Sequence, residues 1–335
     1  MKTLSILCFW LMCCCAGMAQ AQSPEPDENE RVAADAQAAL WWADFDELER
    51  QHALYQQAGQ RTASGRSKLV LFRRGLGRVM NGPERAIDAY FVQMEALTLQ
   101  WAQARPASAL AHVLHAAALV AHAWSYRGSG YANTVPPEAW RDFERYIAKA
   151  TDYLAKHEAV ALSSSSGHVE LLNLGKARGW QPAALWSIAQ AGLARNVDDE
   201  GLYRDMLTAV LPKWGGSTVL VDRVINDIAK LTAPLHGDIY YSRMYAWAAD
   251  AEFHHQIFKD TGASWPRMKA GYEQMLVRYP APVNVNSLAY FACLARDKPA
   301  LIDLLERIGP KPHLDVWGKN ASRTFETCKR FAAES

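Results

Sequence analysis

Six cationic and aromatic side chains at or near predicted loops are the residues best suited to binding a ligand. They are Arg127, Tyr131, Lys213, Trp214, Arg243 and Trp265. Cations attract anions, and aromatic rings stack on sugars and other flat groups, so this combination suits an anionic or sugar-like ligand. The same side chains could instead cap helices and fill corners, because aromatic residues mostly serve cores through their buried area. The sequence leaves both interpretations open.

Histidines and serines could carry metal or catalytic chemistry, but their spacing completes no such site. His112, His115 and His122 lie on one alanine-rich segment, and His255 follows Glu252 by three residues. A di-metal helix bundle also needs a complementary Glu and a second Glu-x-x-His pair, which the sequence lacks. Neither Gly-x-Ser-x-Gly nor His-Glu-x-x-His occurs. We therefore expect structural histidines, no metal, no cofactor and no catalytic residue.

The segment 1–21 has the composition of an export signal. A lysine gives a positive start, Leu4–Met18 is an apolar run too short for a comfortable membrane span, and Ala19-Gln20-Ala21 is a small-residue cleavage site. We predict cleavage after Ala21 and a periplasmic or secreted protein. A lipid anchor on Cys13–Cys15 is the other possibility, but a lipid-modified cysteine normally follows a small residue and here Met12 precedes the cluster.

Four of the six cysteines lie in the predicted signal, so the mature chain keeps Cys293 and Cys328. Cys293 could act as a nucleophile with a distant histidine, but an oxidising compartment favours joining the two thiols. Cys328 shares the apolar face of a predicted final helix with Phe325 and Phe331. We predict a Cys293–Cys328 disulfide that attaches this helix to the preceding repeat.

Charge and composition exclude two classes of partner. The formal net charge is +1 and includes the lysine of the predicted signal, so the mature chain is neutral overall. Neither nucleic acid nor an anionic membrane finds the charge asymmetry that long-range attraction requires. No later segment is apolar enough to predict a membrane span in the mature chain. Residues 22–31 are rich in Pro, Asp and Glu and predict a disordered leader, and residues 32–335 predict one helical-repeat domain.

Apolar residues recur at three- and four-residue spacing through the rest of the chain, which predicts about thirteen helices and no strand. The fourteen candidate segments for these helices are 32–58, 68–79, 84–104, 108–126, 138–156, 167–177, 182–195, 200–210, 217–231, 240–258, 267–278, 283–295, 299–308 and 322–333, of which 68–79 has the most ambiguous pattern. Turns fall at Arg127–Val135 and Leu211–Gly216, and the run Ser163–Ser166 predicts a connector. Short connectors between helices of this length predict an all-α fold, an irregular tetratricopeptide-like array of antiparallel helical hairpins (an alpha-alpha superhelix).

Five short motifs carry a resemblance to a known family. They are Arg127-Gly128-Ser129-Gly130-Tyr131-Ala132, Leu211-Pro212-Lys213-Trp214-Gly215-Gly216, Trp265-Pro266-Arg267-Met268, Phe291-Ala292-Cys293-Leu294 and Val316-Trp317-Gly318. With these motifs the chain resembles an uncharacterised family of exported bacterial proteins, domain of unknown function 4034, over most of Phe45–Phe331. The resemblance implies an all-helical, repeat-like fold and assigns no activity and no catalytic residues.

These observations favour a binding module of the cell envelope with a protein or peptide partner and no chemistry of its own. We expect the corners Arg127–Tyr131 and Lys213–Trp214 to line a common groove, because loops along one edge of stacked helical hairpins commonly carry function. The alternative is an envelope hydrolase that acts on a sugar polymer or a peptide through carboxylates that the sequence does not identify.

Intact-mass measurement of the exported protein tests the targeting prediction. We expect a mass that begins at Gln22 and carries no acyl chain, because Ala19-Gln20-Ala21 has the small residues that signal cleavage requires. A mass that retains the segment 1–21, or that includes lipid on a cysteine, would contradict it.

Overall fold

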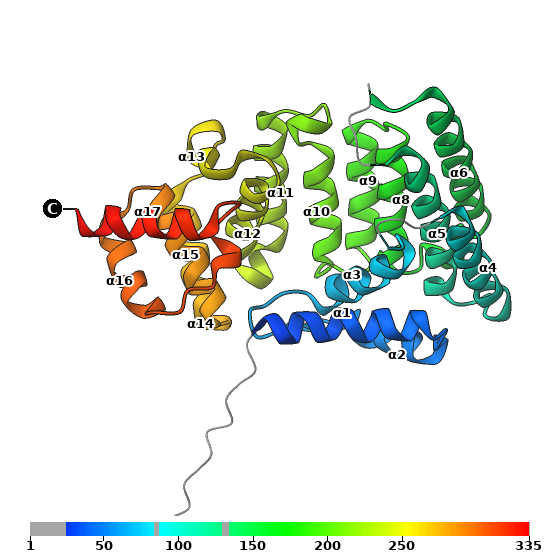
Figure 1. The fold of residues 1–335 in the computed structure, drawn as a ribbon, viewed down its shortest axis with the longest axis horizontal. Coiled ribbons are helices and arrows are strands. Elements are labelled where there is room, and N and C mark those ends of the chain that lie inside the picture. The colour runs from blue at the N-terminus through cyan, green and yellow to red at the C-terminus, as the bar shows by residue number, and fades with distance from the viewer. Residues whose placement is uncertain (1–24, 84–86, 129–133, 335) are drawn as a thin grey trace, which may run out of the picture.

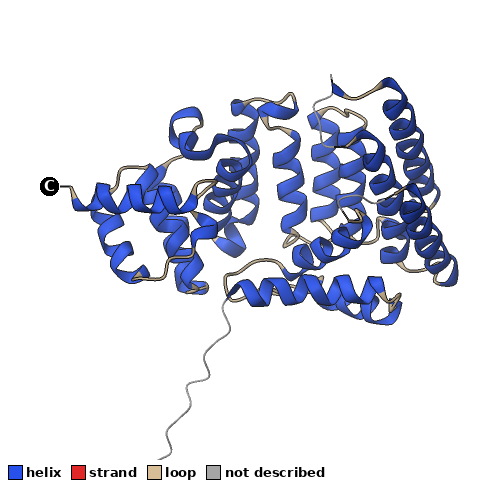
Figure 2. Cartoon of the chain, viewed as in Figure 1, coloured by secondary structure: helices blue, strands red, loops and turns tan. Residues whose placement is uncertain are grey.

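The computed structural model describes residues 25–83, 87–128 and 134–334, and the chain in these ranges folds as an all-α protein (Figures 1 and 2). The signal segment, Tyr131 and the centre of the Arg127–Val135 turn lie outside the described residues. Within the described ranges, no helix combines the length and apolar character that a membrane crossing requires.

The helices follow one another with short connections. They are α1 (Glu25–Trp41), α2 (Phe45–Tyr55), α3 (Lys68–Met80), α4 (Asp88–Ala104), α5 (Ala109–Arg127), α6 (Pro137–Lys156), α7 (Glu158–Ala161), α8 (Ser165–Ala177), α9 (Pro182–Leu193), α10 (Glu200–Ala209), α11 (Thr218–His236), α12 (Ile239–Ala248), α13 (Ile257–Asp260), α14 (Trp265–Arg278), α15 (Pro282–Leu294), α16 (Lys298–Ile308) and α17 (Ala321–Ala333). Short turns of other helix types are η2 (Pro212–Trp214), η3 (Ala249–Phe253), η4 (His254–Gln256) and η5 (Leu314–Val316).

Consecutive helices pack against one another in antiparallel fashion. In Figure 1, α4 to α12 stand side by side in a row, and α1 and α2 run across the lower ends of that row. Helices α14 to α17 form the left end of the molecule, opposite α4 and α6. Helix α3 packs on both α1 and α5, so it connects the transverse helices to the row. This arrangement leaves α3, α10, α12 and the C-terminal helices facing a common space.

Helix α5 is the centre of the first half of the molecule because it contributes to two cores. Leu110 and Leu114 pack with α1 to α4, whereas Val113 and Val120 pack with α6 and α8. A helix buried on opposite sides needs small residues where its neighbours approach closely, which accounts for its many alanines. The apolar spacing of the segment 108–126 therefore marks a helix that is buried nearly all round.

The start of the chain corrects two predictions. Helix α1 begins at Glu25, inside the segment 22–31 that was expected to be disordered, and Val32 and Ala33 are buried. The single helix expected over 32–58 is broken at Ala43, which has a positive φ of 54°, and the Asp44 side chain accepts the Glu47 amide to begin α2. Apolar periodicity continues across the break, so it could not reveal the cap.

The serine run is corrected in part, because Ser163 and Ser164 connect α7 to α8 as predicted, whereas Ser165 and Ser166 belong to α8. Ser165 and Ser166 lie in the first turn of α8, and both are buried. At Gly167, an added Cβ would lie 2.0 Å from the Ala161 carbonyl oxygen. Small side chains are therefore required here, because α8 approaches the end of α7 closely.

The helix expected over 240–258 is also divided. Helix α12 ends at Ala248, and the π-turn η3 follows it. His254 then has a positive φ of 48° before the short helices η4 and α13. Aromatic residues of this segment still face the core, which explains their helix-like spacing. The backbone, however, does not continue as one α-helix.

The predicted disulfide is confirmed. Cys293 of α15 and Cys328 of α17 are bonded, with 5.7 Å between their α carbons and a sequence separation of 35. Closing a loop of this length stabilises the fold by about 4 kcal/mol in the chain-entropy model. The bond matters because α17 is the last helix and packs on neighbours on one side.

A buried ion pair connects α3 to the start of α10. Arg73 Nη1 and Nη2 donate to the two carboxylate oxygens of Asp199 at 2.7 and 2.6 Å, and the Asp199 side chain is fully buried. Asp199 also accepts the Gly201 amide at 3.0 Å and so caps α10. Burial would raise the pKa of Asp199, but Arg73 outweighs burial and holds this pKa below its usual value.

Neighbouring arginines allow a matched test of this pair. We expect Arg73→Met to lower the free energy of unfolding by about 3 to 5 kcal/mol, because it leaves the Asp199 carboxylate buried without a counterion. Arg74→Met is the control: Arg74 is half-exposed and 3.8 Å from Glu30, so its loss should cost at most about 1 kcal/mol. Equal losses in denaturant unfolding would contradict the assignment.

Candidate functional site

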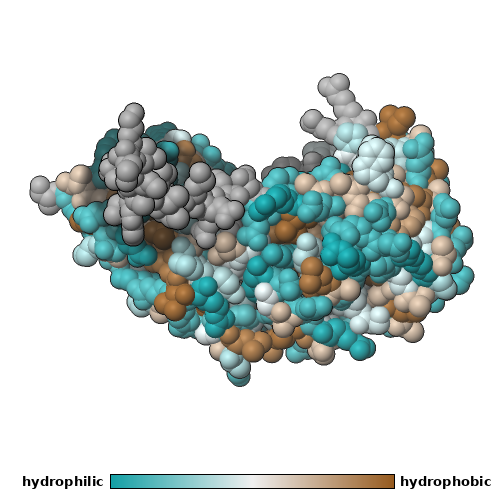
Figure 3. All heavy atoms as spheres, turned by 90° about the horizontal axis from the view of Figure 1, so that it is seen from below, coloured by the Kyte–Doolittle hydropathy of each residue, from teal (hydrophilic) through white to brown (hydrophobic). Residues whose placement is uncertain are grey.

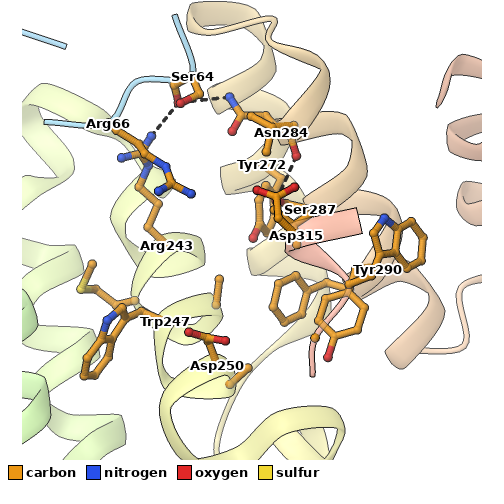
Figure 4. Close-up of a pocket in the computed structure, with 18 of the residues that line it drawn as sticks. Ser64, Arg66, Arg243, Trp247, Asp250, Tyr272, Asn284, Ser287, Tyr290 and Asp315 are labelled. Carbon is orange, nitrogen blue, oxygen red and sulfur yellow. Dashed lines mark hydrogen bonds between the residues drawn. The ribbon is translucent and has the colours of Figure 1, made fainter. Parts of the chain in front are cut away.

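A cavity of about 860 Å³ opens where the N-terminal helices meet the second half of the chain (Figure 4). Its walls come from the segment before α3, from α3, α10, α12, α14 and α15, and from the residues between η5 and α17. This volume falls in the range typical of sites for small molecules and cofactors. The cavity is therefore the first place to look for function.

Arginines form one wall of the cavity. Arg243 of α12 donates from Nη1 to Glu200 Oε2 at 3.1 Å and from Nη2 to the Ser64 carbonyl oxygen at 2.9 Å. Arg61 reaches the same Glu200 oxygen from outside the cavity at 3.4 Å. Burial would raise the pKa of Glu200, but the surrounding arginines outweigh burial and keep it below its usual value. Glu200 is thus an ionised carboxylate that is held through Oε2.

Two further arginines, Arg66 and Arg204, line the cavity without such engagement. In the described part of the chain, neither guanidinium makes a hydrogen bond or an ion pair, although Arg204 lies 5.8 Å from the centre of the Trp247 ring. Desolvation in the cavity lowers the pKa of Arg66, attraction to Glu200 opposes this shift, and repulsion from Arg243 and Arg204 lowers the pKa further. The wall therefore carries more positive charge than its own carboxylate neutralises.

The opposite wall presents hydroxyl groups and aromatic rings. Tyr272, Ser287 and Tyr290 face the cavity across from Arg66 and Arg243 in Figure 4. Burial raises the pKa of Tyr272 and of Tyr290, so both phenols keep their protons and can donate hydrogen bonds.

One backbone carbonyl holds the two walls in register. The Ser64 oxygen accepts Arg243 Nη2 from α12 and Asn284 Nδ2 from α15, the latter at 3.2 Å (Figure 4). Ser64 itself is buried. The loop before α3 therefore fixes the spacing of α12 and α15 on either side of the cavity.

The third side of the cavity is an irregular backbone segment. Asp250 lies in the π-turn η3, and His254 and His255 follow it along the cavity wall. A π-turn followed by a non-glycine residue with positive φ costs free energy, and such segments are often found at functional sites. Lys213 supports the segment by donating from Nζ to the Ala251 carbonyl oxygen at 2.7 Å.

Of the six binding residues predicted from the sequence, the cavity includes Arg243. Arg127 lies at the end of α5, where its guanidinium is 4.9 Å from the Trp124 ring and 5.1 Å from the Trp140 ring and donates to the Gly128 carbonyl. These contacts fit the corner-packing interpretation of Arg127. Tyr131 lies outside the described residues.

The other three predicted residues lie away from the cavity lining. Lys213 supports η3 from behind, Trp214 is 57% exposed, and Trp265 Nε1 donates to Asp297 Oδ2 at 2.9 Å. The starts of α6 and α11 both lie along the upper edge in Figure 1, with α8 and α9 between them. A shared groove at these corners stays a prediction.

Each histidine of α5 has partners of its own. His112 contacts the Tyr153 hydroxyl and the Pro106 carbonyl, His115 contacts Thr98, and His122 bridges Asp88 and Glu95. The three rings therefore point to different neighbours along the helix instead of toward one metal position.

A buried Ser–His pair lies outside the cavity, and its hydrogen bonds indicate a structural role. His52 Nε2 is 2.9 Å from Ser166 Oγ, and Gln56 Nε2 is 3.3 Å from His52 Nδ1. Because the Gln56 amide donates to Nδ1, the proton of the neutral ring is on Nε2 and points to Ser166. Arg73 Nη2 also donates to Ser166 Oγ at 2.8 Å. His52 consequently cannot accept the serine proton, as a nucleophilic site requires.

Sequence reasoning missed Arg66, Arg204, Trp247, Asp250 and Tyr272. Arg66 follows a Thr-Ala-Ser-Gly stretch that indicated only the end of a helix, and the others lie on predicted helical faces. No local spacing connects residues so far apart along the chain. The division of the segment 240–258 was the closest available signal, and apolar periodicity concealed it.

No protein-family model, curated protein or solved structure matches this chain. The resemblance to the exported family stays a prediction, and the argument for function depends on the geometry of the cavity.

The buried His52 gives a pH-dependent stability that can be measured. Burial, with a contribution from Arg73, lowers the pKa of His52 from 6.5 to about 3. Below pH 6.5 the unfolded chain binds a proton that the folded chain does not, so stability present above this pH is lost as the pH falls. Between about pH 5 and 6.5, one such group gives the free energy of unfolding a slope of at most about 1.4 kcal/mol per pH unit. We expect His52→Gln to reduce this slope.

Urea unfolding at several pH values measures this slope. His255→Gln, at an exposed position, is the control and should keep the slope of the parent protein. An unchanged slope in His52→Gln would show that His52 does not contribute.

Proposed function

We propose that this protein is an exported, tetratricopeptide-like binding module that holds a ligand, or a segment of a partner, in the cavity between α12 and α15. The packing of consecutive antiparallel helices supports the array, and the segment 1–21 supports export. The observation that carries the proposal is the cavity of about 860 Å³ with its arginine wall and its facing hydroxyl groups.

The walls of the cavity are preorganised, as a binding site requires. Arg243 is held by Glu200 and Ser64, and Asn284 fixes the opposite side through the same carbonyl. Groups that are already ordered lose little conformational freedom on binding, so more of the contact free energy appears as affinity.

One face of the outer surface offers less to a partner than the cavity does. On the face drawn in Figure 3, apolar and polar residues are interspersed. Exposed apolar side chains that occur singly are normal for a soluble protein, whereas contiguous apolar patches mark docking sites. This favours recognition through the cavity.

The hydrolase alternative requires a carboxylate free to act as acid or base. Glu200 is committed to Arg243 and Arg61. Asp250 and Asp315 line different parts of the cavity in Figure 4, and no observation joins them to a nucleophile. We therefore propose binding without chemistry.

Ser287 and Ser187 allow a matched test of the cavity. In both, Oγ donates to the carbonyl four residues earlier in a helix, but Ser287 lines the cavity and Ser187 is exposed on α9. Each immobilised variant is incubated with cell-envelope extract, and the retained molecules are identified by mass spectrometry. We expect Ser187→Trp to retain what the parent protein retains, and Ser287→Trp to lose it because the indole fills the site.

Melting temperatures within a few degrees of the parent are needed for both variants, so that loss of fold is not read as loss of binding. Retention of the same molecules by Ser287→Trp would contradict the proposal. Arg127→Ala and Trp214→Ala in the same assay test whether the corners Arg127–Tyr131 and Lys213–Trp214 line a common groove. If they do, both variants should lose the retained molecules while the melting temperature stays near that of the parent.

A further inference from the structure

The charges around Glu200 do not balance. Four arginines act on this carboxylate, namely Arg61, Arg66, Arg204 and Arg243. Glu200 bonds to Arg243 and Arg61, and Arg61 also bonds to Asp198 at 3.0 Å. Arg66 and Arg204 share the remaining positive charge of the wall. Asp315 attracts Arg66 across the cavity but lies outside ion-pair distance of it.

The unbalanced charge has an electrostatic cost. Removing a cation from water is unfavourable unless an anion replaces the lost hydration. The Arg66 guanidinium is partly desolvated in the cavity, although the residue keeps exposed surface, and Arg243 and Arg204 repel it. Together these effects outweigh the attraction of Glu200 and hold the pKa of Arg66 below its usual value. An anion placed between Arg66 and Arg204 would remove this penalty and gain charge-assisted hydrogen bonds.

Arg243 adds an unused donor to the same wall. Its Nε is buried and, within the described residues, has no hydrogen-bond partner. Burying a donor without a partner is unfavourable, so this nitrogen adds to the uncompensated polar character of the arginine wall.

From this placement, and resting on the proposed function, we infer that the cavity binds a ligand with one anionic end. A carboxylate or a phosphate lies between Arg66 and Arg204, and the apolar or ring part of the ligand lies against Trp247 and the wall of Tyr272 and Tyr290. Asp250 and Asp315 on the far sides disfavour a second negative group there. The site thus selects a ligand by charge at one end and by shape at the other.

Three small probes separate the contribution of charge from that of the ring. Phenylacetate and phenylacetamide have the same shape and differ in charge, and phenyl phosphate replaces the carboxylate with a phosphate. Dissociation constants are measured by ligand-observed NMR at matched ionic strength. We expect phenylacetamide to bind at least about tenfold more weakly than the better of the two anions, and the ratio of the anions to identify the head group.

Arginine variants then locate the anion. Arg66→Gln and Arg204→Gln should each weaken binding of the anionic probes about tenfold or more. Arg223→Gln, on the exposed surface of α11, is the matched control and should bind like the parent protein. Because the Arg66 guanidinium makes no hydrogen bond or ion pair within the described residues, Arg66→Gln should melt within a few degrees of the parent, whereas loss of a structural contact would lower the melting temperature.

Equal affinity for phenylacetate and phenylacetamide would overturn the inference, as would parent-like binding in both cavity variants or no binding of either anion at millimolar concentration. Any of these results is compatible with a neutral ligand retained by the parent and lost in Ser287→Trp. The inference can therefore fail while the proposed function stands.

Discussion

Three consecutive carboxylates, Asp198-Asp199-Glu200, stand at the start of α10, and each is held by a cation from a different part of the chain. Asp198 pairs with Arg61 and His236, Asp199 with Arg73, and Glu200 with Arg243. The N-terminus of a helix favours negative charge, but burial makes each carboxylate costly unless it is paired. The loop before α3, α3 itself, α11 and α12 must therefore converge on one end of α10. The cavity lies beside this point of convergence.

The need to pair these buried carboxylates also explains why Arg243 is held in place on one wall of the cavity and why this wall carries excess positive charge. Arg243 cannot leave Glu200 without exposing a buried carboxylate, and its second contact, the Ser64 carbonyl, also receives Asn284. The fold thus uses some arginines to neutralise its own carboxylates and leaves Arg66 and Arg204 directed to the cavity. Cations in a partly desolvated site interact with an anion more strongly than surface lysines do, because water screens them less.

The remaining walls depend on different interactions. The C-terminal helices carry Asn284, Ser287 and Tyr290, and the Cys293–Cys328 bond holds α17 against α15 behind them. The π-turn η3 is the least regular wall, and Lys213 binds its Ala251 carbonyl from outside. One predicted binding residue therefore contributes to the cavity indirectly, through the backbone it supports.

The sequence by itself determined the local order of this protein: most helices end within a few residues of their predicted limits, because apolar spacing, Pro and Gly act over a few residues. It also determined the disulfide, since only two cysteines follow the predicted signal. Apolar periodicity does not record the break at Ala43, the π-turn after Ala248 or the helical Ser165, because it continues across changes in the backbone. The cavity was decided by tertiary structure alone. Its charge imbalance arises from Arg66, Glu200 and Arg243, which are far apart in the chain and meet only when buried carboxylates require their counterions.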